Sequence, residues 1–367
     1  MAAASPDGTR RYAERHAGRI PASHFRSGLG DLTVASLGIG TYLGNLDDAT
    51  DAAYADAIRA AFRLGTNLVD TAANYRAQRS ERAVGNALAA AIAAGEVGRD
   101  EVIVCSKAGY LPFDGTYPTD AARFIHETYV QSGLLAAADV VGGHSLAPGY
   151  LAHQIDRSRA NLGVDTIDVY YLHNPESQLA SVPRAEVLAR IARAFTVLEE
   201  AVQAGKIGCY GLATWNGFRV ESRARDHLSL AEIVRLVERT IGPTHRFRAI
   251  QLPCSLAMTE AVTARHQRVG DELGSLVEAA DHHGITVIAS ASLLQGKLTA
   301  QLPAVLAEAM EGCRTDAQRA LQFVRSSPGI TSALVGMRRR SHVEENLALA
   351  AIPPASDEAY VRLFTES

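Results

Sequence analysis

The sequence predicts an α/β fold, a (β/α)8 or TIM barrel. Short apolar runs alternate with longer segments whose apolar residues recur three and four positions apart, which is typical of buried parallel strands followed by helices. About eight such strand-helix units follow one another, the number that closes a barrel. No Gly-x-Gly-x-x-Gly follows a strand, and no Gly-x-x-x-x-Gly-Lys-Ser/Thr phosphate loop occurs. Their absence disfavours a Rossmann domain or a P-loop.

The first residues do not belong to the predicted barrel. Residues 1–24 contain Arg10, Arg11 and Arg15 but lack the apolar core of a secretory signal, so we expect a flexible arm. From Phe25 the chain predicts a small hairpin that turns at residues 28–30. We therefore expect one barrel domain over residues 25–367.

The barrel elements follow in order. The predicted strands cover residues 34–40, 67–70, 102–106, 167–172, 209–213, 249–252, 286–289 and 332–335. The predicted helices cover residues 51–64, 80–94, 149–162, 184–204, 228–239, 270–283, 314–326 and 341–350.

One connection interrupts this rhythm. About forty residues separate Lys107, at the end of the third strand, from the helix that begins near Tyr150, and aromatic residues are frequent among them. Barrel enzymes build their sites from loops at this end of the strands, so we expect a substrate-covering loop with a short helix near residues 119–132. An insertion without function is the alternative.

Composition excludes several classes of protein. The net charge is −4 and the sequence pI is near 6.3, which gives no basic surplus for nucleic acid. The four cysteines show no Cys-x-x-Cys pair, so we expect reduced thiols and no metal site. No apolar run approaches the roughly 20 residues of a membrane span. We expect a cytoplasmic protein that acts on small molecules, whose oligomeric state the sequence leaves open.

Polar residues gather where predicted strands end. Asp70 closes the second strand and Tyr75 follows it, Lys107 closes the third strand, and His173 follows the fourth. A barrel brings these strand ends to one mouth. An aspartate can hold an ammonium beside a phenol and so lower the phenol's pKa, which would let Tyr75 protonate a carbonyl oxygen while His173 orients it. Taken singly, each residue also has a purely structural interpretation.

These residues resemble a known family. Asp70-Thr71-Ala72-x-x-Tyr75, the strand-end Lys107 and Leu172-His173-x-Pro175 are similar to motifs of the aldo-keto reductases, and the resemblance extends over nearly the whole chain. It implies a barrel that binds NADPH, or else NADH, without a Rossmann domain, and it implies a catalytic tetrad of Asp70, Tyr75, Lys107 and His173. The cofactor contacts that it implies are Gly40, Thr41, Tyr42, Asp70, Thr214, Gln251, Ser290, Leu293, Gln295, Gly336, Arg338, His342, Glu345 and Asn346.

The chain departs from the family pattern at two nicotinamide positions. Ala213-Thr214 stands where the family has Ser-Asn, which leaves Thr214 with one hydroxyl and Gln251 as the main carboxamide partner. Ser290 stands where the family commonly has a stacking aromatic, worth roughly 1 kcal/mol. Trp215 is either a substitute stacking partner or a core residue.

The closing segment predicts an anion site. Ser341 with Glu344 three residues later forms a capping box for the last helix, and Arg338, Arg339 and Arg340 precede it. A helix N-terminus beside arginines suits the cofactor's 2′-phosphate, with Arg338 as the main contact. A solvated basic turn is the alternative.

The sequence therefore predicts an NADP(H)-dependent oxidoreductase that reduces an aldehyde or ketone, or oxidises the alcohol. Tyr42, Tyr110, Phe113 and Trp215 are the expected substrate contacts, for a partly apolar carbonyl or sugar-like compound. Two alternatives remain: a nucleotide-binding sensor barrel with little turnover, and a lyase that uses Lys107 as a Schiff-base nucleophile.

Overall fold

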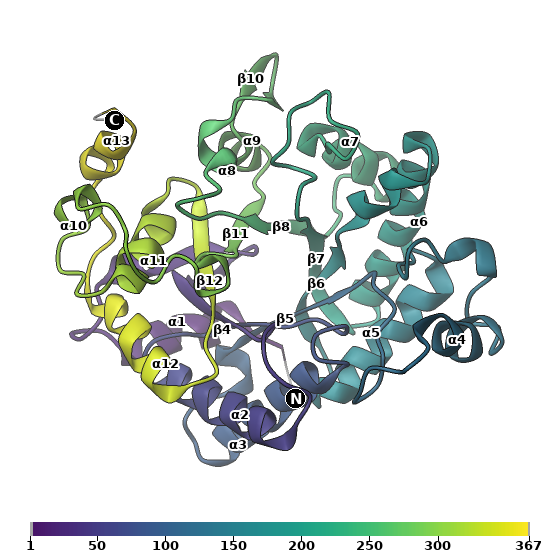
Figure 1. Cartoon of the computed structure of the whole chain (residues 1–367), viewed down its shortest axis with the longest axis horizontal. Helices are drawn as coiled ribbons and strands as arrows, with labels where there is room; N and C mark the ends of the chain where they lie inside the picture. Colours follow the sequence, from purple (N-terminus) through teal and green to yellow (C-terminus); the bar gives the residue numbers. More distant parts are fainter. Residues whose placement is uncertain (1–2, 366–367) are drawn as a thin grey trace.

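The computed structural model describes residues 3–365 and shows a closed barrel of eight parallel strands. Neighbouring strands follow the order β3-β4-β5-β6-β7-β8-β11-β12 before the sheet closes. Figure 1 looks at the ring of strands, with helices arranged around it. The barrel strands are β3 (Leu37–Gly40), β4 (Leu68–Asp70), β5 (Ile103–Ala108), β6 (Ile167–His173), β7 (Ile207–Ala213), β8 (Phe247–Pro253), β11 (Thr286–Ser290) and β12 (Ile330–Gly336).

The larger helices form the outer layer, and their buried apolar residues join one extended cluster with the outward-facing side chains of the strands. These helices are α2 (Asp48–Arg63), α3 (Arg79–Ala93), α5 (Pro148–Leu162), α6 (Arg184–Gln203), α7 (Leu230–Ile241), α9 (Leu276–His282), α11 (Asp316–Ser326) and α12 (Arg340–Leu347). A second, smaller cluster fills the inside of the barrel; it includes Leu68, Ile103, Val169 and Tyr171. Because side chains fill its interior, the barrel is a packed core and not a channel.

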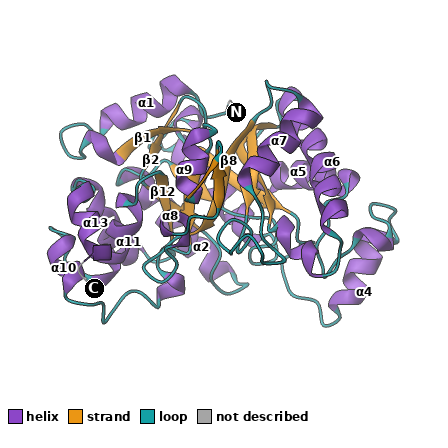
Figure 2. Cartoon of the chain, turned by 90° about the horizontal axis from the view of Figure 1, so that it is seen from above, coloured by secondary structure: helices purple, strands orange, loops and turns teal. Residues whose placement is uncertain are grey.

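The hairpin predicted before the barrel is present. Strands β1 (Phe25–Gly28) and β2 (Leu32–Ala35) pair antiparallel and lie at the end of the barrel where its strands begin. In Figure 2 they lie with α1 on one side of the strands, and α4 lies on the other side. The predicted first strand over residues 34–40 is in fact two strands, β2 and β3, which break at Ser36. The amide of Ser36 donates to the carbonyl of His24 beside the hairpin, and its carbonyl accepts from the amide of Ala333 in the barrel, so the chain passes from one sheet to the other at this residue.

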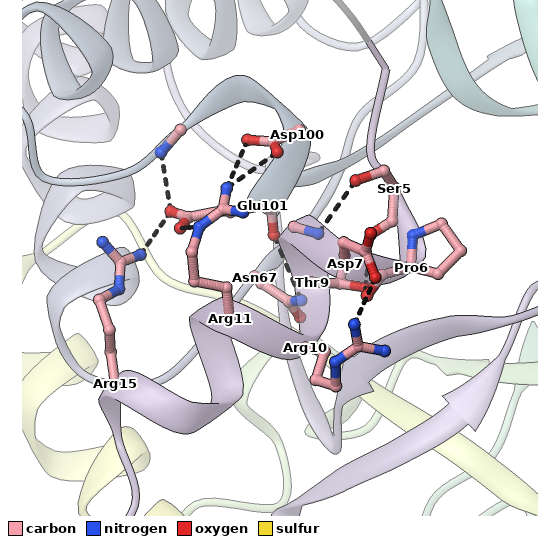
Figure 3. Close-up of polar contacts among 12 residues, drawn as sticks. Ser5, Pro6, Asp7, Thr9, Arg10, Arg11, Arg15, Asn67, Asp100 and Glu101 are labelled. Atoms are coloured by element: carbon pink, nitrogen blue, oxygen red, sulfur yellow. Dashed lines mark hydrogen bonds and ion pairs between the residues drawn. The ribbon is translucent and has the colours of Figure 1, made fainter.

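The first residues form a docked helix, which corrects the expectation of a flexible arm. Helix α1 (Pro6–Arg15) begins at Ser5, whose side chain accepts a hydrogen bond from the backbone of Gly8. Arg11 and Arg15 both bind the carboxylate of Glu101, as Figure 3 shows, although that carboxylate is only 2% exposed. A buried carboxylate needs cations beside it, so pairing with the body of the barrel orders the segment.

Tyr12 also fixes α1 against the barrel. Its ring is fully buried, and its hydroxyl donates to the carbonyls of Phe62 and Thr66 at 2.6 and 2.9 Å. Amphipathic spacing in a segment of only 10 helical residues is a weak signal, and the partners of this helix lie some fifty to ninety positions away in the sequence.

Two other predicted elements differ from the structure. The helix predicted over residues 270–283 begins only at Leu276, capped by Ser275 and Glu278, because β9 (Gln267–Val269) and β10 (Glu272–Gly274) form a hairpin before it. The last predicted helix, over residues 341–350, is shorter: α12 ends at Leu347, and a 3₁₀ turn over Ala348–Ala351 and helix α13 (Asp357–Thr365) follow it. Tyr360 of α13 stacks on Phe323 of α11 at 5.2 Å between ring centroids.

The long connection after β5 is present and partly helical, as predicted. It contains α4 (Ala121–Ile125), a π-helical turn over His126–Val130 and a 3₁₀ turn over Ala137–Asp139. The remaining short elements are helices α8 (Glu260–Thr263) and α10 (Val305–Ala309) and the 3₁₀ turns Ala22–His24, Arg99–Glu101, Pro175–Ala180 and Leu294–Gly296. No helix in the described part of the chain is long and apolar enough to cross a membrane.

Candidate active site

The ends of β4, β5, β6 and β8 bring the candidate polar residues to one end of the barrel. Asp70 is the last residue of β4 and pairs in register with Gly40 of β3. Lys107 lies near the end of β5, and His173 ends β6 opposite Ala213. Gln251 of β8 is the register partner of Ala213. The carboxyl ends of parallel strands meet at one face, so sequence positions up to 181 apart become neighbours.

Asp70 and Lys107 form a buried ion pair, as the sequence predicts. The ammonium of Lys107 lies 2.5 Å from Oδ1 of Asp70 and donates a second hydrogen bond to the carbonyl of Thr71 at 2.8 Å. Both side chains are at most 5% exposed. Burial lowers the pKa of Lys107, but Asp70 and Tyr75 together raise it above its ordinary value. Lys107 is therefore an ammonium at neutral pH, which is unsuited to a Schiff-base nucleophile.

Tyr75 lies above this pair. Its hydroxyl oxygen is 3.4 Å from Nζ of Lys107, and Nζ lies 4.8 Å from the centroid of the ring. Burial raises the pKa of Tyr75 above 10, although the charge of Lys107 acts in the opposite direction. The expectation that the ammonium lowers this pKa overall is therefore corrected for the free protein, because desolvation outweighs the attraction. Tyr75 is a protonated donor.

A left-handed turn holds Tyr75 in place. The three residues after it, Arg76, Ala77 and Gln78, all have positive φ angles, of 49°, 52° and 68°. For residues other than glycine this conformation costs roughly 1–2 kcal/mol each, so surrounding contacts must maintain it. Two hydrogen bonds join this turn to the loop after β5. The amide of Gly115 donates to the carbonyl of Ala77, and the side chain of Gln78 donates to the carbonyl of Phe113.

His173 presents an imidazole to the same space. Its ring packs edge-on against Tyr75 and Tyr110, at 5.7 and 5.2 Å between centroids, and its Nδ1 is buried with no partner among the described residues. Burial, reinforced by the charge of Lys107, lowers the pKa of His173 well below 6.5. The ring is therefore neutral and has a nitrogen free for a ligand.

The sequence reasoning missed the support behind His173. His144 donates from Nε2 to the carbonyl of His173 at 2.7 Å, because its other nitrogen accepts from Gln178. Burial lowers the pKa of His144 to about 4 and keeps it neutral. A Cβ on Gly109 would lie 2.5 Å from Nε2 of His144, so only glycine, here at φ +153°, leaves room for this contact. His144 comes from the long loop, where no periodicity could have indicated it.

The expected nicotinamide residues lie around the same mouth. Gln251 donates from Nε2 to Oδ2 of Asp70 at 2.8 Å, which leaves its Oε1 free to accept. The hydroxyl of Thr214 is buried without a partner among the described residues. Tyr171, one layer deeper in the barrel, also has an unpartnered hydroxyl. Of the other expected contacts, Ser290 ends β11, and Leu293 and Gln295 lie in and beside the 3₁₀ turn that follows it.

The two glycines at the expected pyrophosphate side meet in register. Gly40 ends β3 and pairs with Gly336 at the end of β12. A Cβ on either would find no atom closer than 3.9 Å, so the space beside them is open. Thr41 is tied to the carbonyl of Asp70. This junction gives a ligand close access to the backbone.

The arginines at the start of α12 differ in their partners. Arg338 reaches the loop after β3, where a Cβ on Gly44 would lie 3.5 Å from its Nη1, and it forms no ion pair or hydrogen bond within residues 3–365. Arg340 instead pairs with Glu344 along the surface of α12. The predicted capping box at Ser341 is wrong. The helix begins one residue earlier, at Arg340, and no side chain caps it.

The helix N-terminus therefore keeps free amides, as an anion site requires. His342 is exposed, Glu345 is partly buried, and Asn346 is buried with an unpartnered Oδ1. Arg76, which the sequence reasoning did not single out, is also near: it is 3% exposed, with its guanidinium carbon 5.5 Å from the ring centroid of Tyr54 and with its Nη1 unpartnered within the described chain.

Three of the four expected substrate residues line the mouth. Tyr42 contacts Tyr75 at 5.0 Å between centroids and is 56% exposed. Tyr110 packs on His173, and Asn174 donates to its hydroxyl at 3.2 Å. Trp215 is 46% exposed, so it is not a core residue.

The position of Phe113 differs from the expectation, and Glu176 is a residue that the sequence did not indicate. Phe113 packs instead within the loop, against Phe124 and Tyr117, and has no ring contact with Tyr75 or His173. Glu176 was missed; it accepts the amides of residues 215–217 and so fixes the turn that presents Trp215.

No group of three or more His, Cys, Asp or Glu side chains is placed to hold a metal ion within the described residues. The four cysteines are free thiols, three of them buried. The polar machinery of this mouth is thus an ion pair, a phenol and a neutral imidazole.

Comparisons with known proteins agree with this architecture. The profile of the Aldo/keto reductase family matches residues 36–363. The NADH-specific methylglyoxal reductase of Escherichia coli strain K12 is 28% identical over 216 residues, which cover 56% of this chain and 55%, about half, of that relative. The L-glyceraldehyde 3-phosphate reductase of the same strain is 24% identical over 325 residues, or 79% of this chain and 76% of the relative.

Solved structures show the same fold. An aldo-keto reductase of Bacillus halodurans, in its holo form, superposes with a TM-score of 0.62 at 20% identity and covers 93% of this chain and 95% of that one. An aldo/keto reductase of Klebsiella pneumoniae in complex with NADP and acetate gives a TM-score of 0.61 at 20% identity, with coverage of 94% and 95%.

Proposed function

The chain belongs to the aldo/keto reductase family, and on that premise we propose that it is an NADP(H)-dependent oxidoreductase that reduces an aldehyde or ketone, or oxidises the alcohol, with Tyr75 as the general acid or base. The observation that carries the proposal is the contact of the Tyr75 hydroxyl with the buried Asp70–Lys107 pair. The family relatives named above include two reductases of small carbonyl compounds, which is consistent with this chemistry.

Tyr75 donates the proton. Reduction of a carbonyl places negative charge on its oxygen, and the phenol gives its proton to that oxygen as the charge develops. The phenolate that remains is stabilised by the ammonium of Lys107, which Asp70 holds in place. The raised pKa of Tyr75 in the free protein keeps the proton on the donor, and the nearby ammonium lowers the free energy of the anion that forms.

His173 orients the carbonyl. The imidazole is neutral, so it donates a hydrogen bond from one nitrogen without competing as an acid. Its ring packs edge-on against both Tyr75 and Tyr110, which limits its rotation. Two donors on one oxygen fix the direction in which the carbonyl carbon faces the hydride source.

The residues at the mouth fit a nicotinamide nucleotide. The unpartnered hydroxyl of Thr214 and the free Oε1 of Gln251 offer one donor and one acceptor, which match the oxygen and the NH₂ of a carboxamide. Gly40 and Gly336 leave space for a phosphate chain, and Arg338 supplies an unpaired guanidinium. The bound reduced nucleotide supplies hydride to the carbonyl carbon.

The substrate we propose is a small, partly apolar carbonyl compound or a sugar-like ketone. Tyr42, beside Tyr75, and Trp215, after the end of β7, offer exposed aromatic side chains. The amide of Asn174, which donates to the hydroxyl of Tyr110, adds a polar group. Aromatic walls with few polar groups are typical of such pockets.

An assay of aldehydes, ketones and ketose sugars, followed by NADPH absorbance, tests the proposal. We expect turnover of at least one class by the wild type and a loss of at least roughly 100-fold in Tyr75→Phe with NADPH binding retained. Tight NADPH binding with no turnover across the panel would contradict the reductase and favour a sensor. Equal rates in the wild type and Tyr75→Phe would remove Tyr75 as the acid.

A further inference from the structure

The end of the barrel opposite the active-site mouth contains a cavity. It has a volume of about 630 Å³ and is bordered by the first residues of three strands and by the β1–β2 hairpin. Thr286, which begins β11, lines this cavity, whereas Ser290 ends the same strand at the mouth. Four strand steps separate the two, roughly 13 Å. Figure 2 shows the β1–β2 hairpin on the side of the strands away from α4.

Three arginines line this cavity: Arg26 of β1, Arg248 of β8 and Arg325 of α11. None of them forms an ion pair with a carboxylate in the described part of the chain. Asp281 and Asp357 also border the cavity, and both are exposed at its rim. The residues that border the cavity therefore carry a surplus of positive charge, and both carboxylates among them are exposed to water.

Two of these arginines also have structural roles. Arg325 is fully buried and donates to the carbonyls of Leu349 and Ile352 at 2.7 and 2.5 Å. Arg26 donates to Ile330 and to the backbone carbonyl of Arg325, both at 2.5 Å. Carbonyl dipoles satisfy hydrogen bonds but do not neutralise two adjacent charges. Burial and, to a smaller extent, the charge of Arg26 lower the pKa of Arg325 to about 9.

Arg248 has no such structural explanation. It is half-buried, and within residues 3–365 its one hydrogen bond is to the carbonyl of the preceding residue, Phe247, at 2.9 Å. Among the described residues, Arg248 therefore neither bonds to a carbonyl group of another element nor neutralises a carboxylate. Its planar fork matches a phosphate or carboxylate in two hydrogen bonds at once.

We propose that this cavity, at the amino ends of β8, β11 and β12, binds a small phosphate-bearing molecule through Arg248 and Arg26, with Arg325 adding charge from below. Three guanidiniums without carboxylate partners favour a multiply charged anion over a monocarboxylate. The volume lies within the range of sites for sugar phosphates or mononucleotides. The site is separate from the reductase mouth and does not depend on the proposed reaction.

The test measures stabilisation by inorganic phosphate and pyrophosphate against sodium chloride at equal ionic strength. A ligand that binds only the folded protein raises its melting temperature in proportion to its affinity. We expect phosphate and pyrophosphate to stabilise the wild type, and Arg248→Gln to require at least roughly 10-fold more of either anion for the same shift. Arg248 makes a single local hydrogen bond, so its loss should cost the fold little.

Two matched variants identify the source of any response. Arg123→Gln removes an exposed guanidinium on α4, and Arg338→Gln removes the unpaired guanidinium at the mouth. Arg123→Gln should respond to phosphate as the wild type does, whereas Arg338→Gln should lose only the part of the response that comes from the mouth. The proposal is overturned if neither anion stabilises the wild type, if Arg248→Gln responds normally, or if only Arg338→Gln loses the response. Should Arg248→Gln not fold, crystals of the wild type grown with pyrophosphate decide: density between Arg26 and Arg248 supports the site, and density only at the mouth refutes it.

Discussion

Gln251 donates a hydrogen bond from its Nε2 to Oδ2 of Asp70, at 2.8 Å, on the carboxylate oxygen that Lys107 does not occupy. The carboxylate can only accept, so the amide nitrogen must face it and Oε1 must face the mouth. Gln251 therefore has a double role: it completes the solvation of the buried ion pair, and it keeps an acceptor for a ligand. The donor that a nicotinamide carboxamide also needs is left to Thr214.

Thr214→Val removes that donor at nearly constant volume. The hydroxyl has no partner among residues 3–365, so we expect an unchanged or slightly higher melting temperature, because an unsatisfied buried hydroxyl costs free energy. NADPH affinity should fall by roughly 5- to 10-fold, as one neutral hydrogen bond is worth about 1 kcal/mol. Ser332→Ala is the control, since it removes another unpartnered buried hydroxyl, on β12. Equal NADPH affinity in wild type and Thr214→Val would exclude the contact.

Tyr75→Phe should lower the rate of carbonyl reduction by at least roughly 100-fold and leave the fold intact. Within the described part of the chain the hydroxyl makes one hydrogen bond, a long one of 3.4 Å to Nζ of Lys107, so its removal costs little stability. Tyr42→Phe, which changes the neighbouring ring in the same way, should keep most of the activity. Steady-state rates and circular dichroism of both variants provide the comparison.

Lys107→Met should lower the rate to a similar degree but also destabilise the protein. It leaves Asp70 buried without a cation, which typically costs about 3–5 kcal/mol. The double variant Asp70→Asn/Lys107→Met removes both charges and should recover much of the stability without recovering activity. Urea unfolding measures the change in stability, and the rate of turnover measures the loss of activity. A stable, inactive single variant would show that the pair contributes little to the fold.

Arg338→Gln should weaken NADPH selectively, by roughly 10- to 150-fold, and leave NADH nearly unaffected. This change in affinity corresponds to the loss of one guanidinium-phosphate contact of about 1.5–3 kcal/mol. Arg340→Gln is the matched control because Arg340 already pairs with Glu344 on the surface of α12. Dissociation constants for both nucleotides test it. If the wild type binds both equally, or if no arginine variant changes the ratio, the 2′-phosphate site lies elsewhere.

Trimming the loop after β5 should raise the Michaelis constant more than it alters cofactor affinity. Phe113 and Tyr117 belong to the aromatic cluster of this loop, whose backbone bonds to the turn that follows Tyr75. Replacing both by alanine loosens that cluster, so the loop should cover the substrate less well. Leu273→Ala, an exposed apolar change on the β9–β10 hairpin, should change neither parameter. Unaltered kinetics in the double variant would leave the loop without a covering role.

Stability should decline as the pH falls from about 6.5. Burial lowers the pKa of His24 to about 3, below its value of about 6.5 in the unfolded chain. The unfolded state therefore binds more protons between these values, and the free energy of unfolding falls there by about 1.4 kcal/mol per pH unit for such a group. His24→Gln should show a shallower decline between pH 7 and 5 in urea unfolding. The same slope in both proteins would mean that His24 is not the group responsible.

The sequence by itself determined the barrel and the four residues that meet at its mouth. Strand and helix periodicities are local properties, and the ends of parallel strands lie together in any barrel, so Asp70, Lys107 and His173 could be placed without coordinates. The resemblance of the same motifs to a family indicated the chemistry that we propose for this cluster. The hairpin before the barrel followed from its turn residues for the same local reason.

Tertiary structure decided everything that depends on partners distant in sequence. Helix α1 is ordered by Glu101 and Phe62, Gln251 is oriented by Asp70 across 181 positions, and Tyr75 is held by a left-handed turn that the long loop maintains. The pKa of Tyr75 depends on the balance of burial against the charge of Lys107, and burial is known only once the chain is packed. The arginine-lined cavity likewise exists only because three strand beginnings and a hairpin meet. Desolvation and nearby charges change a pKa according to the distances between groups in the folded protein, and a sequence pattern does not contain those distances.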